Sequence, residues 1–373
     1  YGTWRTDIPR VDGYSPELIS ADFHKISAQT DMDKLEYFHE GCDTLYKAFD
    51  RNVKRIPDHP MLGTMTGPEG AEKYEWMTFK QVSVAAREFA AGCQALNLIP
   101  EVEGAGKTFR FLGIQAKNRK EWGISHIGNF HSGTTTIALY DTLGEEASKY
   151  VINQTELITV AMSGDLVPKM IKLKVDATAA GDDRMARLVN LVTFDDINAT
   201  VKEEASSAGV TVYHFNEVLA KGKETLAANA DFDWKPVEPT REDCPMFSYT
   251  SGTTGDPKGV MLTHGALCGT SASVQLWLGA SILGEADTYI SYLPAAHSFE
   301  AALFAMSIIY GVKCGYFGGD VLKLVGRDLP LLKPTFFPSV PRLYNKIFGK
   351  LKAGIDAATG VKAWLVSKAV AAK

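Results

Sequence analysis

The chain has 373 residues, 45% of them hydrophobic, which is enough for one large α/β body or two lobes around a substantial core. Its 39 basic and 44 acidic residues give a formal net charge of −5, and without a long basic run this balance argues against a nucleic-acid partner. No apolar stretch is long enough to cross a bilayer, since the best candidate, Ala301 to Val312, is typical of a buried helix.

The five cysteines are scattered through the chain and stand mostly among apolar or small residues: Cys42, Cys93, Cys244, Cys268 and Cys314. This pattern indicates buried thiols in a reducing compartment rather than disulfides or a metal site. The chain begins with Tyr1 rather than methionine, so we expect further residues upstream.

The predicted elements start after a polar lead-in, residues 1–40, which prolines and a glycine interrupt. Helices are predicted over residues 44–53 and 78–96, the second with a capping box formed by Thr78 and Gln81. From residue 109, strands and helices alternate at intervals that favour a parallel sheet. The predicted strands are residues 109–115, 134–139, 158–162, 188–194 and 210–213, and the predicted helices are 119–129, 145–154, 166–173 and 215–227.

A polar, proline-containing connection over residues 229–245 predicts a soft boundary between two α/β subdomains. We therefore expect a first subdomain at 41–235 and a second at 236–373.

Residues 104–108, Gly-Ala-Gly-Lys-Thr, resemble the end of a Walker A loop. Because Glu101 stands where that loop needs a glycine and a strand is predicted to follow, we interpret this segment as an ordinary turn.

The most informative segment is Tyr249 to Gly259, which opens the second subdomain. Its glycines allow backbone N–H groups to approach an anion, its hydroxyls donate hydrogen bonds, and one lysine supplies a positive charge. A strand over 246–248 is predicted to enter the loop and a helix capped by Thr263 to leave it, as in many anion sites. The alternative is a surface turn with an exposed lysine. The candidate binding residues are Thr250, Ser251, Gly252, Thr253, Thr254, Gly255, Lys258 and Gly259.

The residue order of this loop is not that of Walker A, but it resembles the phosphate-binding signature of the adenylate-forming enzymes at every fixed position. This family includes acyl-CoA synthetases, luciferases and peptide-synthetase adenylation domains. Further segments, 117–122, 139–144, 318–320 and 332–348, are similar to its long-chain fatty acyl-CoA synthetase branch. The resemblance implies that the apolar residues of 332–348 build a strand and a helix beside the substrate tunnel. Structural roles remain open for these residues, with Trp122 in the core and Asp141 and Thr142 ending a strand and capping a helix.

Residues 291–300 resemble a second segment of the family, in which a histidine lies near the acyl carboxylate and the α-phosphate. The resemblance makes His297 a candidate catalytic residue that stabilises charge in the transition state. The alternative is a histidine whose hydrogen bonds are satisfied at the end of a strand. Ala301 stands where the branch usually has an arginine, so the resemblance carries over no specificity from that position.

The resemblance implies the large N-terminal domain of the adenylate-forming fold, an α/β structure of mostly parallel sheets flanked by helices. It also implies a long-chain fatty acid–CoA ligase that uses ATP, Mg²⁺ and CoA. Thr250 would lie closest to the Mg²⁺, while Thr253, Thr254 and a catalytic Lys258 would hold the β- and γ-phosphates. Such an enzyme acts in the cytoplasm or on the cytosolic face of an intracellular membrane such as the endoplasmic reticulum, with peripheral membrane association.

Several segments of the family are absent from this sequence: the Tyr-Gly-x-Thr-Glu adenine segment, the Thr-Gly-Asp ribose segment and the C-terminal lysine. We therefore expect the chain to be the N-terminal part of a longer enzyme, without the C-terminal lid domain and inactive by itself. Two alternatives remain open. One is another adenylate-forming ligase, acting on an aryl or amino acid or resembling luciferase, and the other is a non-catalytic nucleotide- or acyl-binding protein.

Overall fold

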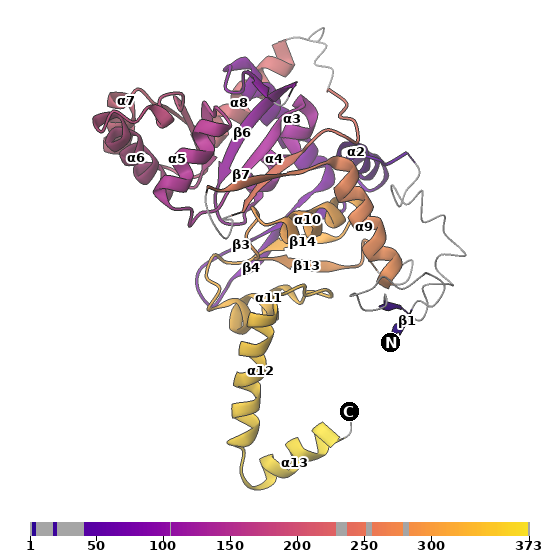
Figure 1. Cartoon of the computed structure of the whole chain (residues 1–373). Coiled ribbons are helices and arrows are strands. Elements are labelled where there is room, and N and C mark those ends of the chain that lie inside the picture. Colours follow the sequence, from indigo (N-terminus) through magenta and orange to yellow (C-terminus); the bar gives the residue numbers. More distant parts are fainter. Residues whose placement is uncertain are drawn as a thin grey trace, which may run out of the picture.

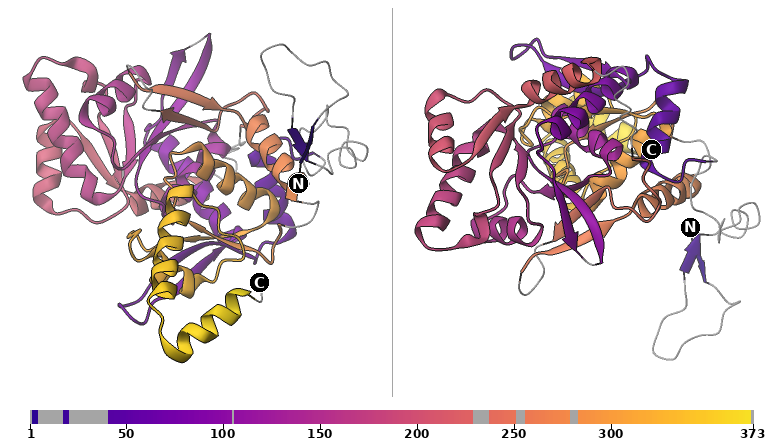
Figure 2. Two further views of the ribbon diagram at one scale, coloured as in Figure 1. Left: turned by 60° about the horizontal axis from the view of Figure 1, so that its bottom comes forward. Right: turned by 90° about the horizontal axis from the view of Figure 1, so that it is seen from above.

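The computed structural model describes residues 2–4, 18–20, 41–104, 106–228, 237–250, 256–278 and 283–371. Two sheets, an eight-stranded one and a four-stranded one, form the centre of the molecule, and helices cover and separate them (Figures 1 and 2). The predicted fold class, an α/β structure with largely parallel sheets flanked by helices, is confirmed.

The larger sheet is parallel from β10 through to β11 and ends in an antiparallel hairpin, β11–β12. The short β5 pairs with β6 in a second hairpin, in which Gly104, Lys107 and Thr108 of the Walker-like segment are strand residues, and the strand predicted to follow this segment is present. In their order across the sheet the strands are β10 Thr211–His214, β9 Asn190–Thr193, β8 Thr159–Met162, β6 Lys107–Gln115, β7 Thr135–Leu139, β11 Met246–Thr250 and β12 Lys258–Leu262, with β5 Glu101–Gly104 beside β6.

The smaller sheet has four strands, of which the first three are parallel and the last is antiparallel to its neighbour. They are β13 Thr288–Ser291, β14 Lys313–Tyr316, β3 Pro60–Thr66 and β4 Lys73–Thr78. A separate antiparallel pair joins β1, Gly2–Trp4, to β2, Leu18–Ser20.

Every helix predicted between residues 44 and 227 is present, but the one predicted at 166–173 extends to Ala179, and the helix Ala199–Ser207 was not predicted. Thr44 caps α2, and the capping box of Thr78 and Gln81 at the start of α3 is present with both of its hydrogen bonds. The helices are α2 Leu45–Arg55, α3 Phe79–Ala95, α4 Lys120–Ser132, α5 Glu145–Gln154, α6 Val167–Ala179, α7 Ala199–Ser207, α8 Phe215–Ala228, α9 His264–Leu278, α10 Ser298–Tyr310, α11 Leu329–Leu332, α12 Pro341–Asp356 and α13 Gly360–Ala371. Short turns of helix, η2 Gly164–Leu166, η3 Asp183–Met185 and η4 Leu324–Asp328, complete the set.

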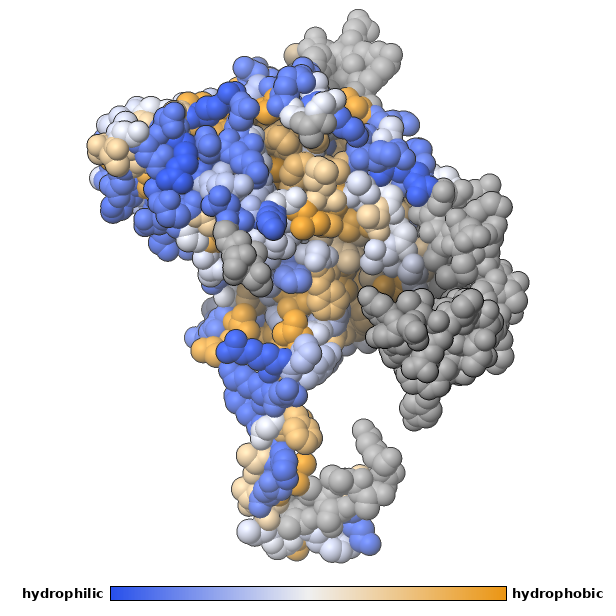
Figure 3. Space-filling model, in the orientation of Figure 1, coloured by the Kyte–Doolittle hydropathy of each residue, from blue (hydrophilic) through white to orange (hydrophobic). Residues whose placement is uncertain are grey.

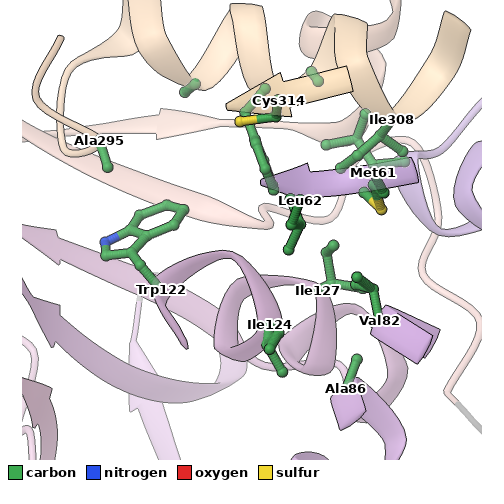
Figure 4. Packing of buried hydrophobic residues seen from close by; sticks show 14 of the residues in the cluster. Met61, Leu62, Val82, Ala86, Trp122, Ile124, Ile127, Ala295, Ile308 and Cys314 are labelled. Carbon is green, nitrogen blue, oxygen red and sulfur yellow. The ribbon is translucent and has the colours of Figure 1, made fainter. Parts of the chain in front are cut away.

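The main core lies between the two sheets. Figure 4 shows Met61 and Leu62 of β3 facing Ile124 and Ile127 of α4, with Cys314 of β14 beside them. The predicted burial of α10 is confirmed. Trp122 is buried, as expected, and so are all the cysteines except the half-buried Cys244. A second apolar cluster lies under α5 and α6 on the larger sheet.

The chain passes between the sheets in a way that the sequence did not predict. Strands β3 and β4 precede the larger sheet in the chain but belong to the smaller one, whereas β11 and β12 follow residue 235 and belong to the larger one. The boundary expected between residues 235 and 236 therefore does not coincide with a division between the sheets. The reason is that strand pairing depends on partners far away in the sequence, such as Leu62 with Cys314.

The final segment also differs from its expected form. Residues 332–348 were expected to supply a strand and a helix beside a substrate tunnel, but the strand is only an isolated bridge between Phe336 and Tyr289. Helix α12 extends away from the body of the molecule (Figure 1), contains no buried residue and leaves Arg342 exposed. None of the helices in the described ranges has the length and hydropathy needed to span a membrane.

Candidate active site

A cleft of about 600 Å³ opens where the carboxyl ends of strands from both sheets meet. It receives residues that directly follow β6, β7, β13 and β14. In parallel α/β sheets this edge is the usual place for a ligand, because loops from several strands converge there. In Figure 3, apolar residues gather in the middle of the molecule between helices α5–α7 and α12. The lining residues are Ala116, Lys117, Asn118, Leu139, Tyr140, Asp141, Tyr292, Leu293, Pro294, Ala295, Ala296, Phe317, Gly319, Asp320 and Val321.

The predicted phosphate loop comprises the end of β11, the start of β12 and the residues between them. The two paired strands are here called the phosphate hairpin, and the residues that connect them are called its tip. Five of the candidate residues, Ser251, Gly252, Thr253, Thr254 and Gly255, lie outside the described residues. The two residues that flank the tip are paired across the hairpin: Thr250 faces Lys258, and the Thr250 hydroxyl donates a long hydrogen bond of 3.5 Å to the Lys258 carbonyl oxygen. Both side chains are exposed, so the lysine ammonium and the threonine hydroxyl are available to a ligand.

Gly259 has a local structural reason to be a glycine. It pairs with Tyr249 across the hairpin, and a Cβ atom at this position would lie 3.0 Å from the tyrosine ring. The Tyr249 hydroxyl donates to Gln154 at 2.7 Å, which fixes the ring across the hairpin. Gly259 thus allows the tyrosine to lie flat against the base of the candidate phosphate loop.

The helix expected to leave the loop is displaced from it. Thr263 caps α9 as predicted, because its hydroxyl accepts a hydrogen bond from the Ala266 amide at 3.1 Å. However, strand β12 lies between the hairpin tip and the helix, so the N-terminus of α9 is at the opposite end of the strand from the loop. The expectation that a helix N-terminus meets the bound anion is wrong, because the residues after Lys258 pair with β11 instead of starting the helix.

The hairpin lies beside the cleft. Strand β11 runs parallel to β7 with Ser248 opposite Ala138, so that, two residues further on, Thr250 is level with Tyr140. Tyr140 lines the cleft. Strand β11 therefore adjoins a strand whose end forms part of the cleft wall.

His297 lies at the N-cap of α10, on the turn that forms another part of the cleft wall. Its Nδ1 atom accepts a hydrogen bond from the Phe299 amide at 3.0 Å, so the neutral ring carries its proton on Nε2. The ring is exposed, and the preceding residue, Ala296, accepts a 2.6 Å hydrogen bond from the Ser248 hydroxyl of β11. The structure thus links His297 to the strand that leads into the phosphate loop.

Sequence reasoning missed several residues of the cleft. Asn118 was noted only as part of a family segment, yet its buried amide holds the turn before His297. Lys117 donates to the Gly319 carbonyl oxygen at 3.1 Å across the cleft. Helix α5 is capped by Gly144 without a side-chain bond, so the expected capping role of Asp141 and Thr142 is wrong. The sequence did contain a signal for these cleft residues. Lys117 and Asn118 follow the predicted strand 109–115 and Asp141 follows the predicted strand 134–139, and the ends of neighbouring strands converge in a parallel sheet.

A buried carboxyl group lies behind the cleft wall. Glu300 in the first turn of α10 is 3% exposed, and burial raises its pKa to about 8, so it is protonated near neutral pH. One of its oxygens hydrogen-bonds to the Ser291 hydroxyl, while the other has no hydrogen-bond partner among the described residues. Glu300 and Asn118 also line a small inner cavity together with Trp122.

The sequence profile of the AMP-binding enzyme family matches residues 49–372 of this chain. The chain belongs to this family.

Among curated proteins, the chain is 33% identical over 354 residues to long-chain-fatty-acid–CoA ligase 1 of Cavia porcellus, covering 94% of this chain and 47% of that protein. It is 29% identical to long chain acyl-CoA synthetase 4 of Arabidopsis thaliana, covering 90% and 47%. The chain therefore spans about half the length of the curated relatives it matches.

Solved structures with the same fold include the adenylation domain of a carboxylate reductase from Mycobacterium chelonae. It matches with a TM-score of 0.68 and 17% identity, covering 92% of this chain and 55% of that one. The anthranilate CoA ligase AuaEII in complex with anthranoyl-AMP matches with a TM-score of 0.60 and 20% identity, covering 83% and 51%. These likenesses establish the fold.

Proposed function

We propose that the protein is a long-chain fatty acid–CoA ligase that works through an acyl-adenylate. The observation that carries the proposal is that the Ser248–Ala296 hydrogen bond joins β11, the strand that leads into the candidate phosphate loop, to the turn of His297. Residues of this turn line the cleft. The choice of a long-chain acid rests on the family segments in the sequence and on relatives named as long-chain ligases.

In the first step, an oxygen of the fatty acid carboxylate forms a bond to the α-phosphorus of ATP, and the bond from that phosphorus to the bridging oxygen breaks to release pyrophosphate. The carboxylate by itself is a poor acylating agent, and the adenylate gives it a stabilised phosphate leaving group. In the second step, the sulfur of CoA forms a bond to the acyl carbon, AMP leaves with the bonding electron pair, and the thiol proton passes to solvent.

The residues of this chain contribute mainly position and charge. Lys258 would neutralise charge on the β- and γ-phosphates, and the hydroxyls of Thr253 and Thr254 would hold these phosphates by hydrogen bonds. His297, with its proton on Nε2, would donate to the oxygen on which charge develops at the reacting centre.

The exposed Thr250 hydroxyl fits one ligand position of a Mg²⁺ ion, which prefers oxygen ligands and would take most of the others from phosphates and water. When bound, this ion would neutralise charge on the leaving pyrophosphate. Such a ligase would act in the cytoplasm or, by peripheral association, at the cytosolic face of an intracellular membrane.

The test is pyrophosphate exchange into ATP, measured with the full-length product of the gene and acids of different classes. We expect exchange that depends on palmitate and is weak with short, aryl or amino acids. Thr250→Val should lower the exchange by at least about tenfold with a change in unfolding free energy within about 0.5 kcal/mol.

Exchange that is strongest with an aryl or amino acid would instead make the protein another adenylate-forming ligase. The anthranoyl-AMP complex of a fold relative shows that this architecture also serves such an acid. Binding of ATP or palmitate without any exchange would favour a non-catalytic binding protein. Residues 1–373 alone, assayed in parallel, are expected to form little or no acyl-CoA.

A further inference from the structure

The turn formed by residues 293–297, here called the histidine turn, is held by one buried side chain from the larger sheet. Asn118 follows β6 and is 7% exposed. Its Nδ2 atom donates to the Leu293 carbonyl oxygen at 2.6 Å, and its Oδ1 atom accepts from the Ala295 amide at 3.0 Å. A single amide group thereby satisfies one donor and one acceptor of the turn, across 175 to 177 positions of sequence.

The second hydrogen of the same amide continues the connection. Nδ2 also donates to the Ser291 hydroxyl at 2.8 Å, and Ser291 in turn hydrogen-bonds to Glu300 in α10. Asn118 therefore connects to both ends of the histidine turn, to the strand that enters it and, through Ser291, to the helix that leaves it. An aspartate would keep the acceptor for Ala295 but lose both donors and place a negative charge beside the Leu293 carbonyl oxygen.

The opposite side of the turn is held by Ser248, whose hydroxyl donates to Ala296. Between these two buried anchors, the backbone before His297 has little freedom to shift. The ring of His297 is itself oriented by its bond from Phe299. The position of the His297 ring relative to the phosphate hairpin thus depends on the hydrogen bonds of Asn118 as much as on the bond that the ring itself accepts from Phe299.

We propose that Asn118 is a positioning residue, which sets the place of the His297 ring relative to the nucleotide through the histidine turn. The inference rests on the proposed function, in which His297 donates to the reacting centre. A misplacement of about 1 Å at such a group can cost about 100-fold in rate, although the residue that causes it touches neither substrate. The expected signature is a fall in kcat with a smaller change in KM for ATP.

The test is a double-mutant cycle of adenylation rates in the full-length product, with Asn118→Ala, His297→Ala and the double variant. We expect Asn118→Ala to lower kcat by about 10- to 100-fold, and to add less than about threefold once His297 is absent, because the two changes remove one interaction. Asn118→Asp should lose nearly as much. A loss that is equally large in the His297→Ala background would overturn the inference.

Asn52→Ala is a matched control. Asn52 is also a buried asparagine, and its Nδ2 donates to the Ile308 and Ile309 carbonyl oxygens at the other end of α10. Asn52→Ala should lower the free energy of unfolding as Asn118→Ala does, but it should leave kcat within about twofold of the parent value. A kcat loss in Asn52→Ala as large as that in Asn118→Ala would mean that general destabilisation explains both, and would also overturn the inference.

A second readout does not need activity. In protein labelled with ¹⁵N-histidine, the ring signal of His297 is identified by its loss in His297→Ala. We expect Asn118→Ala to shift this signal and Asn52→Ala to leave it in place. A shift in a protein that catalyses no exchange would support the positioning role while the proposed function fails. An unmoved signal in an active enzyme would overturn the positioning role alone.

Discussion

The phosphate hairpin and the histidine turn are joined by the Ser248–Ala296 hydrogen bond, but they are built in opposite ways. In the described part of the hairpin, Thr250 and Lys258 are exposed, and the Thr250 hydroxyl makes one long hydrogen bond. The histidine turn is held by buried side chains at distances of 2.6 to 3.0 Å. The difference indicates that the hairpin presents groups to a ligand, whereas the turn fixes a geometry. Substitutions in the hairpin should therefore affect ligand binding, and substitutions behind the turn should affect stability and catalysis together.

The largest expected effect concerns the buried network behind the turn. Because burial raises the pKa of Glu300 from 4.5 to about 8, the folded state binds its proton more tightly than the unfolded state. The stabilisation that comes from this tighter proton binding by Glu300 is fully present below pH 4.5 and is lost as the pH rises to about 8. The isosteric Glu300→Gln should avoid this loss, so its stability relative to the parent should increase by about 3–5 kcal/mol between pH 5 and pH 9.

Urea denaturation of both proteins at several pH values measures this difference. Other groups titrate equally in the two proteins, so only the difference between their curves is informative. Parallel stability curves would show that the Glu300 carboxyl does not titrate in this window.

Next in size is the loss of the hairpin cation. Lys258→Ala should lower the adenylation rate by about 100-fold, equivalent to about 2.7 kcal/mol, since the phosphate charge then lacks its partner. Unfolding free energy should change by less than about 0.5 kcal/mol because the side chain is exposed. Lys350→Ala, an exposed lysine on α12, is the matched control and should change neither quantity. A strongly destabilised Lys258→Ala would remove the contrast between the two regions.

A smaller effect is expected where the two regions meet. Ser248→Ala leaves the buried Ala296 carbonyl oxygen without its donor and should cost about 1–2 kcal/mol of unfolding free energy, with a measurable fall in kcat. Ser271→Ala, also fully buried, removes only a bond within α9 to Leu267 and is expected to cost less and leave kcat unchanged. If both variants lose the same unfolding free energy and keep the parent kcat, the Ser248–Ala296 hydrogen bond does not contribute to catalysis.

The sequence predicted those features that depend on local order. The capping box of Thr78 and the burial of Trp122 each depend on residues within a few positions of the chain. Features that depend on distant partners were missed. Strand β12 exists because Lys258 to Leu262 find β11, and the role of Asn118 depends on a turn 175 residues away. Periodicity and propensity contain no information about such pairings.

The exchange of strands between the two sheets has a consequence for dissecting the protein. Leu62 and Gly63 of β3 pair with β14, so a fragment comprising residues 41–235 would present an unpaired sheet edge and the apolar side chains of Met61 and Leu62 to water. A fragment beginning at residue 236 would in turn carry β11 and β12 without β7. Because each half lacks strands that the other supplies, the walls of the cleft must fold as one cooperative unit, and neither half is expected to survive limited proteolysis separately.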